Sequence, residues 1–363
     1  MTAAQINPAP YIPDHAFPPG ETLRERLNEL GISQADLAAR SGLSVKHVNQ
    51  IVQGVASITP ETALLLERVT GTPARIWNAL EAAYQDAELR SRPAELTLED
   101  RAWLKSLPLT DLRRRGKLRM GTSDLESFRA ALDFFGVADR QAWERVWLKP
   151  HASFRRSRVF KSGPGSTAAW LRLGELDGRS RVVADFDSKL FRQVLIEARA
   201  LTRAHDFSRA LVARCAAVGV VVVFVKETTA CRASGAARWL SPKKALIQLS
   251  DRYKREDSFW FSFFHEAAHI LLHPKRELFV DADKSDDETM ETEANLFAAN
   301  LLVPPTVADT LPNLRSNPDV IGFAAEIGIA AGIVVGRLHN DGIWPWNRGN
   351  ELIKSVEIVP TTT

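Results

Sequence analysis

The sequence is poor in the features that mark secreted and membrane proteins. Only two cysteines, Cys215 and Cys231, occur among 363 residues, which excludes a disulfide scaffold and favours a reducing, cytoplasmic compartment. The longest apolar run, over residues 218–225, is too short to cross a bilayer, so no membrane partner is expected. The proline-rich residues 1–19 lack the basic and apolar regions of a signal peptide and are predicted to form a flexible arm.

The overall charge also says little about function. The net charge of +3 is too small to indicate a nucleic-acid partner by itself. The hydrophobic share of 45% and the charged share of 25% are those of a globular protein, and the length allows two or three packed domains. Two basic clusters, at residues 113–119 and 155–161, are interpreted first as solvated faces, with help in DNA binding as the alternative.

Regular patterns divide the chain after the arm. Residues 20–85 show short helical segments separated by glycine breaks, and residues 86–205 predict a helical middle region. Residues 206–345 combine β-rich runs with long helices, and residues 346–363 are predicted to form a C-terminal tail. The predicted fold class is therefore α+β, mostly α, with a small β-sheet.

The small β-part precedes two long helices. The β-rich runs at 218–227 and 244–250 flank a glycine-containing loop that includes Gly235. The apolar pattern then predicts one helix over residues 258–272 and a second over about 288–302. This order places any motif on the first helix next to the small sheet.

The first of these helices carries the motif H-E-x-x-H, at His265, Glu266 and His269. Residues four apart lie on one helix face, so both imidazoles can bind one metal ion. Glu266 can reach a metal-bound water and act as its general base, because zinc lowers the pKa of such a water towards neutrality. The motif alone could equally be a buried histidine pair with a surface glutamate, so the next helix is needed to decide.

A third ligand is predicted in that next helix, METEANLFAANLLVP. Zinc peptidases use three protein ligands and keep a fourth position open. Glu291, 22 residues after His269, competes with Glu293, because residues two apart point in different directions from a helix. We choose Glu291, since it shares a face with Asn295, which could orient its carboxylate. His273 is interpreted as a helix-end residue near the C-terminal dipole, with assistance to a substrate carbonyl as the alternative.

Together these motifs resemble the ImmA/IrrE family of zinc metallopeptidases. The resemblance rests on H-E-x-x-H followed by E-x-E-A-N-x-F-A-x-x-L-L-x-P and on the stretch WLSPKKALIQLS before the helix, and it covers roughly residues 190–340. It implies a gluzincin-like zincin fold with zinc held by His265, His269 and Glu291 and with Glu266 as general base. It also implies endopeptidase action, often on a DNA-bound repressor.

Residues 34–53, QADLAARSGLSVKHVNQIVQ, have the spacing of a helix-turn-helix. Leu37, Val48 and Ile51 are predicted to face inward and to hold the two helices together. Gly42 stands where the turn needs a positive φ, and Ser44 is placed to cap the second helix. The pattern therefore predicts a DNA-binding unit.

The outward positions of this unit are the candidate DNA contacts. Val45, Lys46 and Gln50 are best placed to meet base edges in the major groove, and Gln34 is placed for a phosphate contact. The segment also resembles the HigA-like branch of the Xre repressor family over residues 20–85, which implies a five-helix, lambda-repressor-like domain that binds a palindromic double-stranded operator as a homodimer. Residues 20–85 hold six Lys and Arg against seven Asp and Glu, so affinity would depend on dimerisation or on the basic clusters.

The sequence therefore predicts a cytoplasmic DNA-binding regulator with a zinc endopeptidase domain that cleaves a partner repressor or antitoxin, or the chain itself. The alternative is a HigA-like antitoxin and repressor, in which the peptidase fold binds a cognate toxin or senses a signal without significant turnover. A purely structural metal site is the weakest hypothesis, because it would need a fourth protein ligand and only three are evident.

Overall fold

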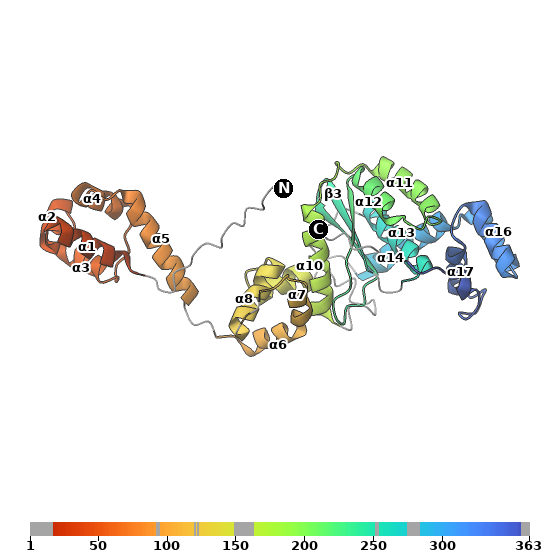
Figure 1. The fold of residues 1–363 in the computed structure, drawn as a ribbon, viewed down its shortest axis with the longest axis horizontal. Helices are drawn as coiled ribbons and strands as arrows, with labels where there is room; N and C mark the ends of the chain where they lie inside the picture. The colour runs from red at the N-terminus through yellow and green to blue at the C-terminus, as the bar shows by residue number, and fades with distance from the viewer. Residues whose placement is uncertain are drawn as a thin grey trace, which may run out of the picture. The chain divides into compact units, whose positions relative to one another are not determined.

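A computed structural model describes residues 17–91, 95–119, 121, 123–148, 163–250, 254–273 and 284–356 (Figure 1). The chain forms two compact units, Met1–Glu95 and Leu96–Thr363. The predicted arm at 1–19 and the basic cluster at 155–161 lie wholly or largely outside the described residues. The predicted class, mostly helical with a small sheet, is confirmed.

The first unit is a bundle of short helices, as predicted. Its described part contains α1 (Pro19–Leu30), α2 (Gln34–Ser41), α3 (Val45–Val52), α4 (Pro60–Thr70) and α5 (Ala74–Ser91). The predicted domain limit at residue 85 falls inside α5, and the structure divides the chain between Glu95 and Leu96.

The turn between α2 and α3 has the chemistry that the sequence predicts. Gly42 adopts φ +76°, a conformation that side chains with a Cβ rarely adopt. The Ser44 hydroxyl accepts a hydrogen bond from the His47 N–H and so caps α3. Leu37 and Val48 are fully buried in the core between the helices. These contacts fix α3 against α2 and leave Val45 and Lys46 of α3 exposed.

The second unit begins with short helices around an aromatic core. These are α6 (Leu98–Ser106), α7 (Leu109–Arg114), α8 (Asp124–Phe135), α9 (Arg140–Trp143), the π-helical turn η1 (Glu144–Leu148) and α10 (Pro164–Ser180). Their shared core includes Trp103, Phe135, Trp143, Trp147 and Trp170. Trp103 packs edge-on against Trp143 with ring centroids 5.5 Å apart.

A three-stranded sheet follows, with strand order β1-β3-β2. Strand β1 (Val220–Phe224) pairs in parallel with β3 (Lys244–Leu249), and β2 (Gly235–Ser241) pairs antiparallel with β3. The sequence predicted a loop between the two β-rich runs. In the structure this loop ends at Gly235, because β2 begins there and occupies the residues before the second run. One face of the sheet contacts α10, where Trp170 Nε1 donates to Val225 O at 2.8 Å.

The opposite face of the sheet packs on α13 (Glu256–Leu272), the helix that carries the metal motif, and α13 belongs to the second group of helices in this unit. This group comprises α11 (Ser188–Leu201), α12 (Ser208–Ala216), α13, α14 (Lys284–Leu302), α15 (Pro305–Ala308), η5 (Leu311–Asn313), α16 (Asn317–Ile327), α17 (Ala331–Asn340) and η6 (Asn350–Leu352). Val220 and Ile247 of the sheet share one core with Phe263 and Phe264 of α13. Helix α11 packs into this core as well, although it lies before residue 206, where the sequence predicts the domain to start.

The last described residues pack against the start of α13. The Glu256 N–H donates to Lys354 O, and the Lys354 N–H donates to Glu256 Oε1, both at 3.0 Å. Arg255 and Ser355 form an isolated antiparallel bridge. Part of the predicted C-terminal tail is thus joined to the first turn of α13.

No individual helix among the described residues has both the length and the apolar character needed to span a membrane. Helices α16 and α17 meet that test only when taken together, and they bend by 112° at the break between them.

Candidate metal centre

Helix α13 presents the H-E-x-x-H motif from a firmly packed support. Phe263, Phe264 and Ala267 are fully buried against the sheet and the neighbouring helices. His265 and His269 lie on another side of the helix, four residues apart and facing α14. The apolar side of α13 therefore fixes the direction in which the two imidazoles point.

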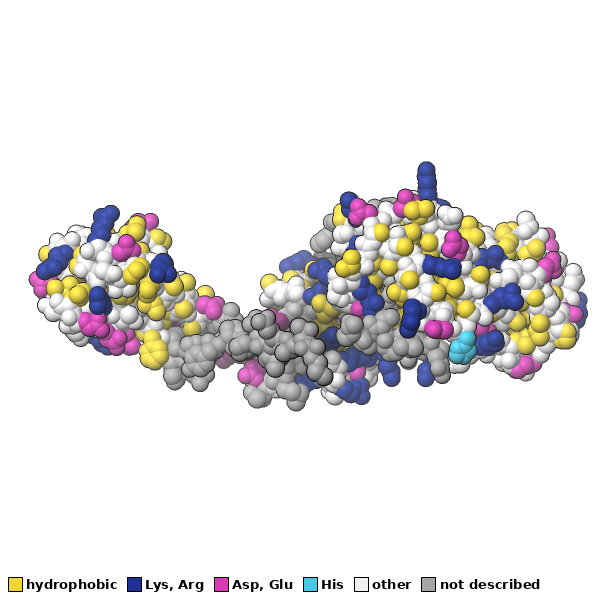
Figure 2. Space-filling view, turned by 45° about the horizontal axis from the view of Figure 1, so that its top comes forward, with side chains coloured by type: hydrophobic (Ala, Val, Ile, Leu, Met, Phe, Trp, Pro, Cys, Tyr) yellow, Lys and Arg dark blue, Asp and Glu magenta, His cyan; other side chains and the backbone are white. Residues whose placement is uncertain are grey.

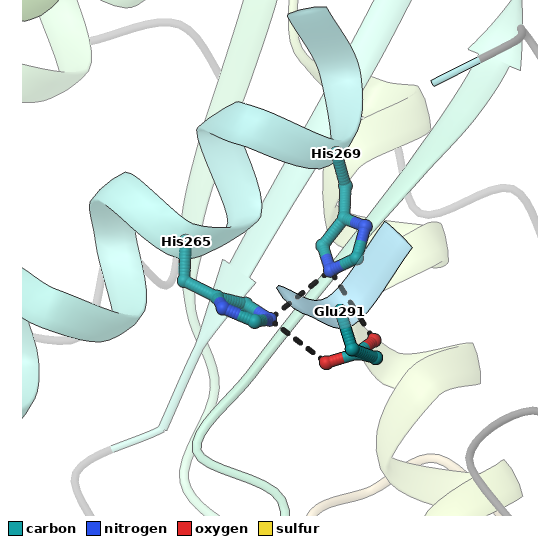
Figure 3. Close-up of side chains that lie close together, drawn as sticks. All are labelled: His265, His269 and Glu291. Atoms are coloured by element: carbon teal, nitrogen blue, oxygen red, sulfur yellow. Dashed lines mark hydrogen bonds and ion pairs between the residues drawn. The ribbon is translucent and has the colours of Figure 1, made fainter. Parts of the chain in front are cut away.

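The two imidazoles meet a carboxylate from the next helix (Figure 3). His265 Nε2 and His269 Nε2 lie 3.0 Å apart, and each lies 3.4 Å from an oxygen of Glu291. One donor atom from each of the three residues lies within 4.8 Å of the other two, which makes a group able to hold a metal ion. The structure thus brings together the three residues that the sequence nominates as ligands.

These distances suit a single small ion. Two ligand atoms bound tetrahedrally to one zinc ion at about 2.0–2.1 Å lie about 3.3–3.4 Å apart. The separations of 3.0 and 3.4 Å observed here are close to that value. The donor set of two imidazoles and one carboxylate is also one that zinc accepts in catalytic sites.

Each histidine has a second partner on the side away from Glu291. His265 Nδ1 lies 3.0 Å from Asn295 Oδ1, so Asn295 orients this imidazole rather than the Glu291 carboxylate that the sequence suggested. His269 Nδ1 lies 2.9 Å from His273 Nδ1. His273 Nε2 in turn lies 3.3 Å from Glu293 Oε2. Glu293 therefore faces His273, and Glu291 faces the two motif histidines.

Glu266 occupies a buried position beside this group. Its side chain is packed under β2, where the Ala237 backbone donates a hydrogen bond to it. Its Oε2 atom has no hydrogen-bond partner among the described residues. Burial raises the pKa of Glu266 to about 7, although the neighbouring His265 opposes the rise. A carboxylate with such a pKa can both take up and release a proton near neutral pH.

The electrostatics favour the metal-binding forms of His269 and Glu291, two of the three grouped residues. Burial, followed by the charge of His265, lowers the pKa of His269 to about 4, so this imidazole is neutral at pH 7. Burial is the largest single influence on Glu291 and works against its ionisation, but the hydrogen bond with His265 and the charges of the nearby histidines together lower the pKa. The pKa of His265 is raised, since contacts with Glu291 outweigh burial. A neutral imidazole and an ionised carboxylate are the forms that bind metal.

The residues predicted to contact DNA lie on the surface of the first unit. Val45 is 54% exposed and Lys46 is exposed, whereas Gln34 and Gln50 are half-buried. Gln34 Oε1 accepts a hydrogen bond from Asn49 Nδ2 at 3.3 Å, which joins the start of α2 to α3. On the face drawn in Figure 2, the described Lys and Arg side chains of this unit are dispersed among acidic ones.

Part of the basic cluster at 113–119 is engaged inside the second unit. Arg114 and Arg115 both pair with the buried Asp111, at 2.6 and 3.0 Å. Arg115 also donates to the carbonyl oxygens of Lys226 and Glu227, at 2.8 and 2.6 Å. Arg115 therefore connects α7 to the segment after β1, a role that neither sequence interpretation of the cluster anticipated.

Comparison with known proteins identifies both parts of the chain. The helix-turn-helix family matches residues 23–77, and the IrrE N-terminal-like domain of the M78 peptidases matches residues 216–339. The protein is thus a helix-turn-helix domain followed by a peptidase-type domain, as the sequence resemblance implied.

Individual relatives match over about a fifth of the chain. An uncharacterised helix-turn-helix transcriptional regulator of Escherichia coli, YddM, is 31% identical over 70 residues, which is 19% of this chain and 74% of that protein. Virulence-associated protein I of Dichelobacter nodosus is 40% identical over 70 residues, again 19% of this chain and 65% of that protein. The structure of the Pseudomonas aeruginosa antitoxin HigA with the higBA promoter is 33% identical, covers 23% of this chain and 100% of that chain, and gives a TM-score of 0.20.

The chain therefore belongs to the helix-turn-helix transcriptional regulators. It is a DNA-binding regulator that also carries an M78 peptidase domain.

Proposed function

We propose that the second unit is a zinc-dependent endopeptidase and that the first unit directs it to operator DNA. The observation that carries the proposal is the grouping of His265, His269 and Glu291 within 4.8 Å, on the helix that also holds the buried Glu266. Two histidines and one glutamate leave a coordination position for water or substrate, which distinguishes a catalytic site from a closed structural one.

His265, His269 and Glu291 would hold the ion. A zinc ion bound there would supply Lewis-acid chemistry, lowering the pKa of water and polarising a peptide carbonyl. Glu266 would take a proton from the attacking water at Oε2 and deliver it to the leaving amine. Its pKa of about 7 supports both transfers, because neither protonation state is strongly disfavoured near neutral pH.

The first unit would bind double-stranded operator DNA through α3. Val45, Lys46 and Gln50 would meet base edges in the major groove, and Gln34 would contact a phosphate. The first unit has a nearly balanced charge, so a homodimer on a palindromic operator would supply the phosphate contacts that one copy lacks. Such a protein would act in the cytoplasm, where operator DNA lies.

The substrate would be a protein bound at or near the same operator. A partner repressor or antitoxin fits this placement, and so does the chain itself. The relative from Pseudomonas aeruginosa is described as an antitoxin with its promoter.

One observation favours the alternative role, in which the peptidase fold binds a partner such as a cognate toxin without significant turnover. Glu266 is only 5% exposed, so solvent has little access to the general base in this conformation. In a repressor whose Glu266 is inaccessible to water, the peptidase fold would serve to bind a partner and would not need to catalyse hydrolysis.

The decisive experiment measures metal content and cleavage in the same preparations. Purified wild-type protein should contain about one zinc per chain by elemental analysis, and His265→Ala and Glu291→Ala should lose it. Glu266→Gln should retain zinc and abolish cleavage of a repressor encoded beside the gene, while the exposed Glu326→Gln serves as the matched control. Zinc retained in both ligand variants would overturn the centre, and cleavage by Glu266→Gln would overturn the mechanism.

A further inference from the structure

The contacts around His269 fix where its proton lies. An imidazole that offers Nε2 to a metal ion carries its proton on Nδ1. His269 Nε2 faces His265 Nε2 and Glu291, so the protonated Nδ1 faces the other way. There it meets His273 Nδ1 at 2.9 Å. Since His269 donates in this contact, His273 Nδ1 must be the acceptor.

The same reasoning fixes the proton of His273. A neutral imidazole that accepts at Nδ1 carries its proton on Nε2. His273 Nε2 lies 3.3 Å from Glu293 Oε2, so it can donate to that carboxylate. His269 then donates to His273, and His273 donates to Glu293, so the two hydrogen bonds have the same direction. The reverse direction would require His269 to protonate the nitrogen that faces Glu291.

Local backbone geometry explains why His273 reaches His269. His273 is the C-cap of α13 and adopts φ −101° and ψ 152°, so the chain leaves the helix at this residue. Its ring stands beside that of His269, with centroids 4.9 Å apart. The His273 side chain is only 8% exposed, so water competes little for its two nitrogens.

We propose that His273 and Glu293 are positioning residues that hold His269 in the tautomer and orientation required for metal binding. This inference rests on the zinc centre proposed above. It assigns different tasks to two acidic residues of α14: Glu291 binds the ion, and Glu293 contacts His273, the partner of the ligand His269. Partners of this kind also raise the basicity of the ligand that they contact.

Zinc affinity of the full chain, measured by competition with a chelator of known affinity, tests this assignment without any activity assay. His273→Leu removes the acceptor and should weaken zinc binding about 10–100-fold. His273→Asn should restore much of the affinity, because its side-chain oxygen can accept from His269 Nδ1 in place of the lost nitrogen. Glu293→Ala should cause a smaller loss, since Glu293 is 54% exposed, and Glu293→Gln should recover it.

A second readout separates positioning from general loss of structure. In zinc-loaded protein labelled with ¹⁵N-histidine, His269 should show a protonated Nδ1 and a metal-bound Nε2, and His273 a protonated Nε2. Leu296→Ala, at an exposed position on α14, is the control and should leave zinc affinity unchanged. Loss of affinity in His273→Leu that His273→Asn fails to restore would overturn the tautomer argument.

The outcomes distinguish the two levels of proposal. If His265→Ala binds zinc as tightly as wild type, the metal centre itself is wrong. If His265→Ala loses zinc but folded His273→Leu retains wild-type affinity, the centre stands and the role of His273 and Glu293 is wrong.

Discussion

Gly235, the first residue of β2, lies directly against the side chain of Glu266. A Cβ added at Gly235 would come within 2.7 Å of Glu266 Oε1 and 2.8 Å of its Cγ, closer than real Cβ atoms approach other atoms. The strand can pass the carboxylate only because position 235 has no side chain. Strand β2, at the edge of the sheet, thus limits the position of the Glu266 carboxylate, the proposed general base.

Gly235→Ala should therefore impair catalysis more than metal binding. The added methyl group would displace the Glu266 carboxylate and destabilise the second unit by about 1–3 kcal/mol through overpacking. Cleavage should fall while the zinc content of folded protein stays at the wild-type value. Gly322→Ala is the control, because a Cβ there meets no atom within 4 Å. Wild-type cleavage by Gly235→Ala would show that the carboxylate has room to move.

Acid should weaken the second unit through Glu175. Burial opposes ionisation of this residue, but Arg238 at 2.6 Å and Arg172 at 3.1 Å lower its pKa below the ordinary value of 4.5. A carboxylate with a lowered folded pKa contributes stability that is present above the unfolded pKa and is lost as the pH falls through the folded pKa. Stability should therefore decline below about pH 4.5.

Glu175→Gln isolates this contribution. Removing the carboxylate leaves Arg238 buried without its partner and should cost about 3–5 kcal/mol at pH 7. The difference from wild type should shrink in acid, as measured by urea unfolding at several pH values. Glu197→Gln breaks the exposed pair with Arg214 and should change stability by less than about 0.5 kcal/mol. A pH-independent difference would rule out the linkage.

Lys46 and Gln50 should contribute differently to operator binding. Lys46→Ala removes a positive charge from the groove, so besides its effect at one base pair it should weaken binding to all sequences and reduce the slope of affinity against salt by about 1. Gln50→Ala should instead relax the preference at one base pair by about 1–3 kcal/mol. Titrations at several salt concentrations with operator and mismatched DNA measure both effects. Equal losses on operator and mismatched DNA for Gln50→Ala would contradict base contact.

Lys117→Ala tests whether the first basic cluster takes part. Lys117 is exposed, but its neighbours Arg114 and Arg115 are engaged with Asp111. We expect operator affinity to be unchanged, because the cluster has a structural role inside the second unit. A clear loss of affinity would assign the cluster to DNA binding instead.

Cys215 should be inert in the folded protein. It is fully buried, and burial raises the pKa of its thiol to about 12. The thiolate is the reactive form, so iodoacetamide at pH 8 should leave Cys215 unmodified in native protein and modify it after denaturation. Mass spectrometry of peptides from both samples decides the matter. Modification of native Cys215 would mean that α12 opens readily.

The sequence predicted best where chemistry and helix periodicity agree. The four-residue spacing of His265 and His269 placed both on one face of α13, and the choice of Glu291 over Glu293 matches the side chain that faces them. The turn at Gly42 and the cap at Ser44 follow from local backbone requirements alone. Such features depend on residues close together in the chain.

Contacts between distant segments could not be predicted in this way. The aromatic core of the middle region depends on packing among Trp103, Trp143 and Trp170, whose separations along the chain carry no periodic signal. Asn295 and His273 were both given other roles by sequence reasoning, because the contacts of Asn295 with His265 and of His273 with Glu293 depend on the angle between α13 and α14.

The hydrogen bonds between Glu256 and Lys354 have a practical consequence for handling the protein. They hold the first turn of α13 in place, and the other end of this helix carries His265 and His269. Proteolytic cleavage just before residue 354 would therefore remove a contact that stabilises the metal-binding helix without altering a ligand. An affinity tag placed directly after residue 356 would lie close to these hydrogen bonds and would disturb them. Zinc content should therefore be compared between N-terminally and C-terminally tagged protein before a low zinc content is attributed to the ligands.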